Sequence, residues 1–360
     1  MRVIGSTEMK RRLGSSSREM QSFLSFRSAD LGIDLGTANT LIFEKKVGLL
    51  VDEPSVVVVD TKTKQIEAVG AEAWKMVGRT PFNRESVYPL KNGVIADLDL
   101  TSEMLKYFLR KVRTGVKILG SRIVICVPTE TTQVERKAVK EAALALRARE
   151  VYIVEEPVAA ALGAGLPICE PRGSMIVDIG GGTTEIAVLS LGDIVNKGSV
   201  RMGGHHMDEA IIQFIRRKYN VLIGQPTAEK VKMEIGCAED PPEKTNAEVK
   251  GKDLIRQMPK VLSVNALEVH EALSRVVSSV VRSIRTVLER TPPEVCVDIV
   301  ESGIALTGGG ALLKGFDQRI ERDTGIRTQL VEDPLLSVVR GTAMLLQQDY
   351  LLERVCLKGV

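Results

Sequence analysis

The fold is decided by the segment Asp178-Ile179-Gly180-Gly181-Gly182-Thr183-Thr184-Glu185, a cluster of glycines between two short apolar runs. Residues 174–177 and 186–191 are both β-like, so the segment predicts a β-hairpin. Three successive glycines leave backbone N–H groups uncovered, which suits a turn that closes around an anion. Asp178 would face that anion, and Mg²⁺ between the two would relieve their repulsion. Taken alone, a glycine-rich hairpin can also be only a tight turn.

A second segment near the start of the chain repeats this pattern. It reads Leu31-Gly32-Ile33-Asp34-Leu35-Gly36-Thr37-Ala38-Asn39-Thr40-Leu41-Ile42-Phe43, an apolar strand, an Asp, a Gly-Thr turn and another apolar strand. The repeat predicts two like domains that face each other, each offering one hairpin and one Asp to the same phosphates. Neither hairpin is a Walker loop, because no Gly-Lys-Ser/Thr follows and a strand is predicted after each turn.

Length and composition limit the class of protein. The 360 residues are enough for about two domains, and 44% hydrophobic with 26% charged residues is typical of globular proteins. A net charge of +3 and 4% aromatic residues predict no nucleic-acid partner. Five scattered cysteines without a C-x-x-C pair indicate reduced thiols in a cytosol. The sequence contains neither an apolar run of about 18 residues nor a secretory h-region.

Two more sites would complete a nucleotide pocket. Glu155 and Glu156 stand at a predicted strand-to-helix junction just before Pro157. One of the two acids would be a helix cap and the other a catalytic base. Further on, the strand at 304–307 is followed by Gly308-Gly309-Gly310 and a helix-like segment from Ala311, which would seat an anion or an adenosine.

Between these sites, strands alternate with helices, which indicates an α/β fold. Helices are predicted over 101–113, 131–147, 208–218, 227–235 and 267–288. The second of them would bury a stripe of Val134, Ala138, Ala142 and Ala145. Residues 238–252 carry many charges and Pro241-Pro242, and predict an exposed loop, either alone or with a short hairpin.

Two features invite other interpretations. His205 and His206 are adjacent, but His270 is the only other histidine and no partner is spaced for a zinc site. Ile118 and Leu119 lie in a predicted loop with basic neighbours, and would either insert among lipid headgroups or fold back into the core. Residues 1–27 would form either a basic amphipathic helix on a membrane or a tail without a role.

In combination, these motifs resemble the actin–chaperone–sugar kinase ATPase superfamily and, within it, the MreB family of bacterial actins. The resemblance runs from about Asp30 to about Leu346 and rests on six segments: Asp34–Thr40, Asn92–Asp97, Val134–Arg136, Glu155–Pro157, Asp178–Glu185 and Leu306–Gly310. It implies an α/β, actin-like (ribonuclease H-like) fold of duplicated domains, with two lobes and four subdomains around a nucleotide cleft. The implied bounds are 1–27 for an extension, 28–170 for lobe I (small subdomain about 58–92), 171–345 for lobe II (small subdomain about 205–268) and 346–360 for a tail returning to lobe I.

The resemblance also implies the roles of individual residues. ATP and Mg²⁺ would be the cofactors, with the metal held by Asp34 and Asp178 largely through water. Glu156, with Thr183 beside it, would orient the attacking water. His205 departs from the family pattern, since an acid usually follows the Gly-Gly pair. The residues expected to bind the nucleotide are Asp34, Gly36, Thr37, Ala38, Asn39, Asp178, Gly180, Gly181, Gly182, Thr183, Glu229, Lys230, Val231, Lys232, Gly308, Gly309, Gly310 and Ala311.

The implied function is structural, with slow ATP hydrolysis coupled to assembly. Such proteins form homopolymers of paired protofilaments in the cytoplasm, on the anionic inner face of the cell membrane. There they work with membrane proteins of the elongation and wall-synthesis machinery and maintain rod shape. The alternative is a plasmid-segregating, organelle-positioning or division-type bacterial actin. A DnaK-type chaperone would need a long peptide-binding domain and a sugar kinase a catalytic acid cluster, and the sequence offers neither.

Overall fold

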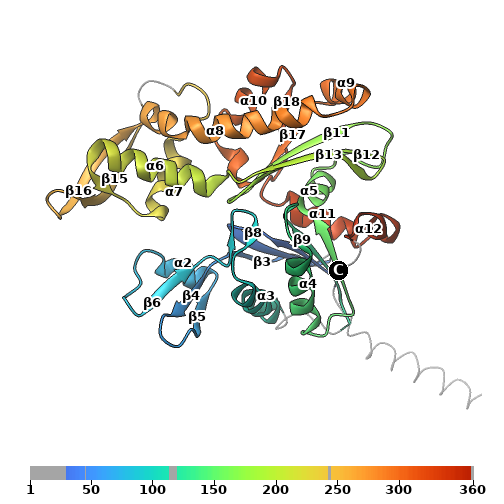
Figure 1. Cartoon of the computed structure of the whole chain (residues 1–360), viewed down its shortest axis with the longest axis horizontal. Coiled ribbons are helices and arrows are strands. Elements are labelled where there is room, and N and C mark those ends of the chain that lie inside the picture. Colours follow the sequence, from blue (N-terminus) through green and yellow to red (C-terminus); the bar gives the residue numbers. More distant parts are fainter. Residues whose placement is uncertain (1–29, 45, 113–119, 242–244, 358–360) are drawn as a thin grey trace, which may run out of the picture.

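The computed structural model describes residues 30–44, 46–112, 120–241 and 245–357, which form two lobes (Figure 1). The predicted N-terminal extension, Ile118 and Leu119 lie outside the described residues. Each lobe contains one five-stranded mixed sheet, helices packed on it, and a smaller sheet toward one end of the molecule. The predicted α/β class and its duplicated architecture are confirmed.

The two large sheets have the same topology. The order in lobe I is β10-β9-β1-β2-β3, and the order in lobe II is β13-β12-β11-β17-β18. In each sheet three consecutive antiparallel strands are extended by two parallel strands, so β1 and β2 correspond to β11 and β12. The strands of lobe I are β1 (Leu31–Leu35), β2 (Asn39–Glu44), β3 (Gly48–Pro54), β9 (Arg122–Val127) and β10 (Glu150–Glu155). Those of lobe II are β11 (Ser174–Ile179), β12 (Thr184–Ser190), β13 (Asp193–Val200), β17 (Ile304–Thr307) and β18 (Thr328–Leu330).

Helices bury the apolar faces of these sheets. The predicted helix after residue 100 is α3 (Leu98–Val112), whose Leu105, Phe108 and Leu109 are fully buried in the core of lobe I. The predicted helix over 267–288 is α8 (Ala266–Glu289), with a continuous apolar stripe in the core of lobe II. The remaining helices on the large sheets are α4 (Gln133–Leu144), α9 (Pro293–Ser302), α10 (Phe316–Thr324) and α12 (Asp349–Val355).

Two short helices form the layer between the lobes. α5 (Glu156–Gly163) packs on β11 and β12 of lobe II, whereas α11 (Ser337–Leu345) packs on β1 and β9 of lobe I. Where they cross, their backbones touch, since a Cβ at Gly163 would overlap the carbonyl oxygen of Ser337 and a Cβ at Gly341 would overlap that of Ala159. Glycine is therefore required at both positions.

The smaller sheets lie on the same side of the molecule (Figure 1). In lobe I the small subdomain contains β4 (Val57–Asp60), β5 (Ile66–Val69), α2 (Ala71–Met76), β6 (Arg84–Val87), β7 (Leu90–Lys91) and β8 (Val94–Ile95). In lobe II it contains α6 (Gly204–Tyr219), β14 (Val221–Leu222), α7 (Gln225–Ile235), β15 (Asn246–Asp253) and β16 (Pro259–Asn265).

Two sequence predictions were wrong in detail. The segment 238–252, expected to be an exposed loop, either alone or with a short hairpin, includes most of β15, whose residues 246–252 pair with β16. Ala247 and Val249 point into the core while Glu248 and Lys250, which alternate with them, face solvent, so the charges hid a period-two strand pattern.

Of the stripe predicted on α4, Ala142 is buried as expected, whereas Val134 is 69% exposed and Ala145 is also exposed. The helix buries Val139 and Ala143 beside Ala142, so its apolar face is rotated from the predicted one.

In the described part of the chain, no helix has the length and apolarity needed to cross a membrane.

Candidate functional site

The first hairpin joins β1 to β2 through Gly36, Thr37 and Ala38. Ser55, buried after β3, fixes this turn by donating its backbone N–H to the Ala38 oxygen (2.8 Å) and its hydroxyl to the Gly36 oxygen (2.6 Å). Its Oγ also lies 2.9 Å from Thr40 Oγ1. Sequence reasoning missed Ser55, because a serine after a strand carries no distinctive signal.

The second hairpin joins β11 to β12, and the turn before α6 supports it. The Gly180 N–H donates to the Thr183 oxygen (2.9 Å), which closes the turn. The N–H groups of Gly204 and His205 donate to the oxygens of Gly180 (3.0 Å) and Gly181 (2.8 Å). The carbonyl oxygens of Gly180 and Gly181 thus accept hydrogen bonds from the turn before α6. The N–H groups of Gly181 and Gly182 donate to no acceptor among the described residues.

The tips of the two hairpins meet. A Cβ built on Gly181 would lie 2.6 Å from the Ala38 Cβ, and one on Gly182 would lie 2.7 Å from the Thr37 Cγ2. Only glycine allows this approach, which explains the two adjacent glycines better than turn geometry alone. The structure therefore brings together the two phosphate-binding candidates that the sequence predicted. It also places Gly93, which the sequence-based site omitted, against the Thr183 side chain.

Four carboxylates lie close together at this meeting point. Burial and Asp178 raise the pKa of Asp34 to about 8, and burial and Glu185 raise the pKa of Asp178 to about 7. Burial, followed by Asp34, Glu185 and Asp178, raises the pKa of Glu156 well above its usual value. Burial also raises the pKa of Glu185, although the Ser199 hydroxyl donates to it over 2.9 Å. Desolvated like charges of this kind are stable as anions only beside a cation.

Within the described residues, this cluster has no basic partner that offsets the shifts. Glu156 Oε1 and Glu185 Oε2 are buried without a hydrogen-bond partner there. At the same time, no three His, Cys, Asp or Glu side chains of the described residues are placed to coordinate one metal ion directly. The acids thus suit a hydrated cation such as Mg²⁺, which keeps several of its waters.

Glu155 and Glu156 differ in their surroundings. Glu155 occupies the N-cap position of α5 without a capping hydrogen bond, and both of its oxygens lie 2.9 Å from Lys197 Nζ of β13. Its charge is therefore neutralised by the ion pair. Glu156 is the first residue of α5, and its free Oε1 leaves it as the acid with capacity for a water molecule.

The residues predicted on α7 have different environments. Lys232 Nζ pairs with Asp208 (2.8 Å) and donates to the Gly204 oxygen (3.2 Å), so it holds the turn that supports the second hairpin. Val231 is buried in the core of lobe II, Lys230 is exposed, and Glu229 is partly buried. Only one face of this helix is thus directed toward the hairpins.

The third glycine site lies against the second hairpin. Gly308 follows β17 and contacts both the Asp178 carboxylate and the Ile179 backbone. A 3-10 helix, η1 (Gly309–Leu312), comes next, with Gly309 exposed and Ala311 buried. In the first hairpin, the Asn39 side chain is exposed and donates to Asp52 Oδ1 (3.0 Å).

Within the described part of the chain, neither His205 nor His206 belongs to a group of three or more His, Cys, Asp or Glu side chains that could hold a metal ion. Burial, Lys232 and His206 lower the pKa of His205 to about 4, so its imidazole is neutral at physiological pH.

Two lobes of equal topology, with hairpin tips that meet over buried acids, define the actin-like class of proteins. A family model described as MreB/Mbl protein matches residues 28–354. This chain belongs to the MreB/Mbl family of actin-like, cell shape-determining proteins.

Individual relatives agree with this assignment. The cell shape-determining protein MreB of Escherichia coli K12 is 47% identical over 327 residues, which cover 89% of this chain and 94% of the relative. The cell shape-determining protein Mbl of Bacillus subtilis 168 is 45% identical, covering 88% and 95%. Among solved structures, MreB5 of Spiroplasma citri bound to ADP superposes with a TM-score of 0.85 at 34% identity, covering 92% of this chain and 99% of that one. A double helical filament of MamK has a TM-score of 0.76 at 21% identity and shows the fold alone.

Proposed function

We propose that this chain binds ATP with Mg²⁺ between its two hairpins and that the nucleotide drives its assembly into filaments on the inner face of the cell membrane. The observation that carries this proposal is the meeting of the glycine tips over buried carboxylates that have no basic partner among the described residues. The N–H groups of the glycine turn, which donate to no acceptor among the described residues, would bind phosphate oxygens. The buried acids next to them, which have no basic partner there, would bind Mg²⁺. The related MreB5 is bound to ADP in one structure and to AMPPNP in another, which supports a nucleotide at the same place.

The roles within this site follow from the contacts. The N–H groups of Gly181, Gly182 and Thr37 would bind the phosphates, and Asp34 and Asp178 would hold Mg²⁺ through its waters. When bound, the metal neutralises charge on the phosphate oxygens. Glu156 would use its free Oε1 to orient a water for slow phosphoryl transfer, beside Thr183. The part of α7 that carries Glu229 and Lys232, together with the Gly308–Ala311 turn, would border the adenosine.

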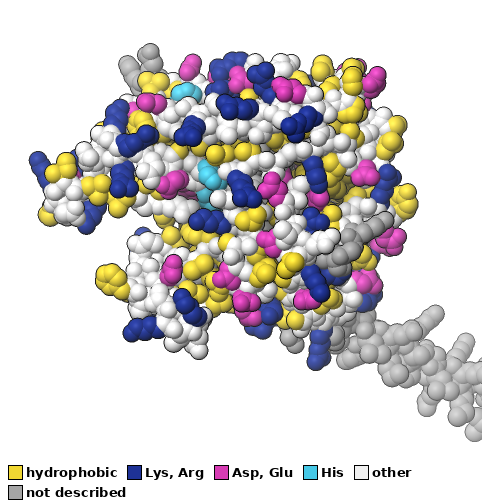
Figure 2. Space-filling view, in the orientation of Figure 1, with side chains coloured by type: hydrophobic (Ala, Val, Ile, Leu, Met, Phe, Trp, Pro, Cys, Tyr) yellow, Lys and Arg dark blue, Asp and Glu magenta, His cyan; other side chains and the backbone are white. Residues whose placement is uncertain are grey.

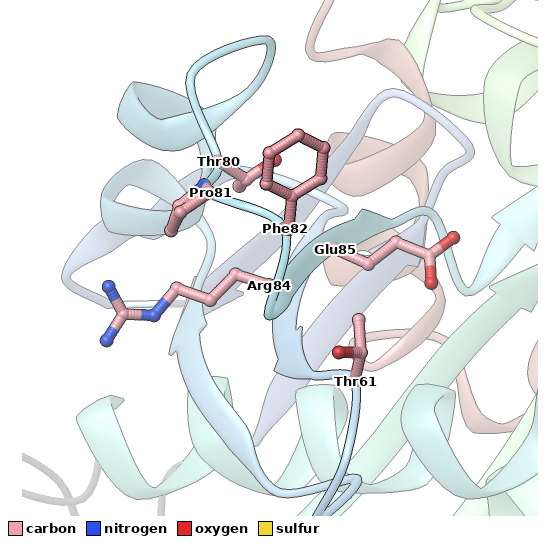
Figure 3. A pocket seen from close by; sticks show the side chains of 6 residues that line it. All are labelled: Thr61, Thr80, Pro81, Phe82, Arg84 and Glu85. Atoms are coloured by element: carbon pink, nitrogen blue, oxygen red, sulfur yellow. The ribbon is translucent and has the colours of Figure 1, made fainter.

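Self-assembly is supported by apolar side chains exposed at the ends of both small subdomains. Phe82, in the loop before β6, is fully exposed beside a hollow of about 390 Å³ (Figure 3). Ile255 and Met258, between β15 and β16, are 76% and 62% exposed. Figure 2 shows that the small subdomains project from the same side of the molecule. Apolar groups gathered at one end suit a head-to-tail contact with the next copy.

Membrane attachment is proposed for the segment that contains Ile118 and Leu119. It connects α3, which ends at Val112, to Gly120 before β9. An apolar pair in a basic setting suits anionic headgroups. The filaments would then act in the cytoplasm as a peripheral layer, together with membrane proteins of the wall-synthesis machinery.

Sedimentation with anionic vesicles, with and without Mg-ATP, tests this proposal. We expect ATP to move the protein into the pellet and vesicles to increase the pelleted fraction. The variant Ile118→Asp/Leu119→Asp should keep the effect of ATP and lose that of vesicles. A protein that stays in the supernatant under all conditions would rule out nucleotide-driven assembly by this chain alone.

A further inference from the structure

Tyr88 joins the two small subdomains. It follows β6 in lobe I, and its side chain packs against a small core of Val56, Val58 and Ala73. Its hydroxyl donates to Oε1 of Gln225, the first residue of α7 in lobe II, over 3.2 Å. Considering the described residues, this is the only side-chain hydrogen bond between segments 58–92 and 205–268.

A ring contact reinforces the same connection. The Tyr88 and His205 rings lie 6.1 Å apart at an interplanar angle of 61°, an edge-on arrangement that aromatic pairs prefer. Burial, Glu229 and Asp208 raise the pKa of Tyr88 to about 12, so its phenol keeps the proton that it donates. His205 is neutral as well, so both rings of the pair are uncharged. The ammonium group of Lys232 therefore does not repel the imidazole that contacts Tyr88.

Both contacts connect Tyr88 to elements that support or border the proposed nucleotide site. The His205 N–H donates to the Gly181 oxygen, so the residue whose ring touches Tyr88 also supports the second hairpin. Gln225 begins α7, whose later turns carry Glu229 and Lys232. Figure 1 shows α6 and α7 in the upper lobe facing the small sheet of the lower lobe. Tyr88 therefore spans the side on which the lobes would have to part.

We propose that Tyr88 is a positioning residue that latches the two small subdomains together around bound nucleotide and slows its release. This inference rests on the nucleotide site proposed above. Departure of the nucleotide requires the lobes to separate, and separation breaks both the bond to Gln225 and the contact with His205. Removing one such neutral hydrogen bond favours the open state by about 3- to 10-fold.

The test is the release of a fluorescent ATP analogue from the full chain, chased with excess Mg-ATP. Tyr88→Phe keeps the ring and loses the donor, so release should become about 3- to 10-fold faster while association changes less. Gln225→Ala removes the same bond from the other lobe and should act to the same extent. The double variant should release no faster than either single variant, because both remove one shared interaction. Gln225→Glu keeps an acceptor and should retain slow release.

Tyr152→Phe is the matched control. Tyr152 also donates its hydroxyl to a side chain, Glu150 (2.9 Å), but on β10, away from the small subdomains. The Tyr152→Phe variant should release the analogue at the rate of the unchanged chain.

Thermal unfolding shows whether Tyr88→Phe is stable enough for its release rate to be compared with that of the unchanged chain. If it is not, the release rate of Gln225→Ala decides the test. Unaltered release from both variants, with tight binding to the unchanged chain, would overturn the latch and leave the nucleotide site standing. Failure of the unchanged chain to bind the analogue would overturn both.

Discussion

At the scale of single residues, burial without a partner distinguishes Glu156 from its neighbour. Lys197 neutralises Glu155, whereas Glu156 lies among Asp34, Asp178 and Glu185. Removing such a like charge relieves repulsion in the nucleotide-free protein, although the proposed mechanism uses the acid.

We therefore expect Glu156→Ala to bind ATP normally and to release phosphate at least about 100-fold more slowly, the size typical of a lost general base. Phosphate release and nucleotide binding would be measured on the same preparation. Glu156→Gln is the matched variant, because it keeps an oxygen to orient water but cannot take its proton. Both variants should melt at a higher temperature than the unchanged chain without nucleotide. Undiminished hydrolysis by Glu156→Ala would remove this residue from the mechanism.

His205 makes stability depend on pH. Its pKa is lowered from 6.5 to about 4 in the fold, mainly by burial. Between those values the unfolded chain takes up a proton that the folded chain does not, so stability is fully present above 6.5 and is lost as the pH falls toward 4. The raised pKa values of Asp34, Asp178 and Glu156 act in the opposite direction over this range, so the contribution of His205 is read from the difference between two proteins. The melting temperature of the unchanged chain, relative to that of His205→Gln, should fall between pH 7.5 and pH 5. Parallel pH profiles for the two proteins would contradict this explanation.

At the scale of elements, the hairpins and helices could be predicted because local rules decide them. The Asp-Leu-Gly-Thr and Asp-Ile-Gly-Gly-Gly turns interrupt apolar strands, and α8 keeps its helical period throughout. The turn at Gly203–His205 and the bracing residue Ser55 could not be found in this way, since their contacts join segments distant in sequence. The strand β15 was missed because its solvent-facing side chains are charged.

The crossing of α5 and α11 yields a prediction at this scale. Gly163→Ala should destabilise the protein by about 1–3 kcal/mol, because the added methyl group forces the two backbones apart. Gly224→Ala is a suitable control, since its Cβ would meet only Pro226 Cδ at 3.7 Å. Denaturant unfolding of both variants would measure the difference. Equal midpoints would show that the crossing can widen without cost.

At the scale of the whole molecule, the exposed apolar ends distinguish assembly from nucleotide binding. Ile255→Asp/Met258→Asp should bind the ATP analogue as the unchanged chain does. Both residues lie in the loop between β15 and β16, outside the two glycine hairpins formed by β1–β2 and β11–β12. It should fail to pellet with Mg-ATP, since two buried charges would oppose the contact between copies. Val47→Asp, at a residue that is 67% exposed on lobe I, serves as the control. Pelleting by the double variant would place the contact elsewhere.

Because the backbones of α5 and α11 touch at their glycine crossing, this point would stay nearly fixed in any rotation of one lobe against the other. Glu156 lies at the other end of α5, roughly 10 Å from Gly163 at 1.5 Å per residue. A rotation about the crossing displaces each atom in proportion to its distance from it. A small rotation of one lobe against the other would therefore displace Phe82 and Met258, at the far ends of the small subdomains, more than it displaces Glu156. A change that scarcely moves Glu156 is thus enough to alter the surfaces offered to the next subunit.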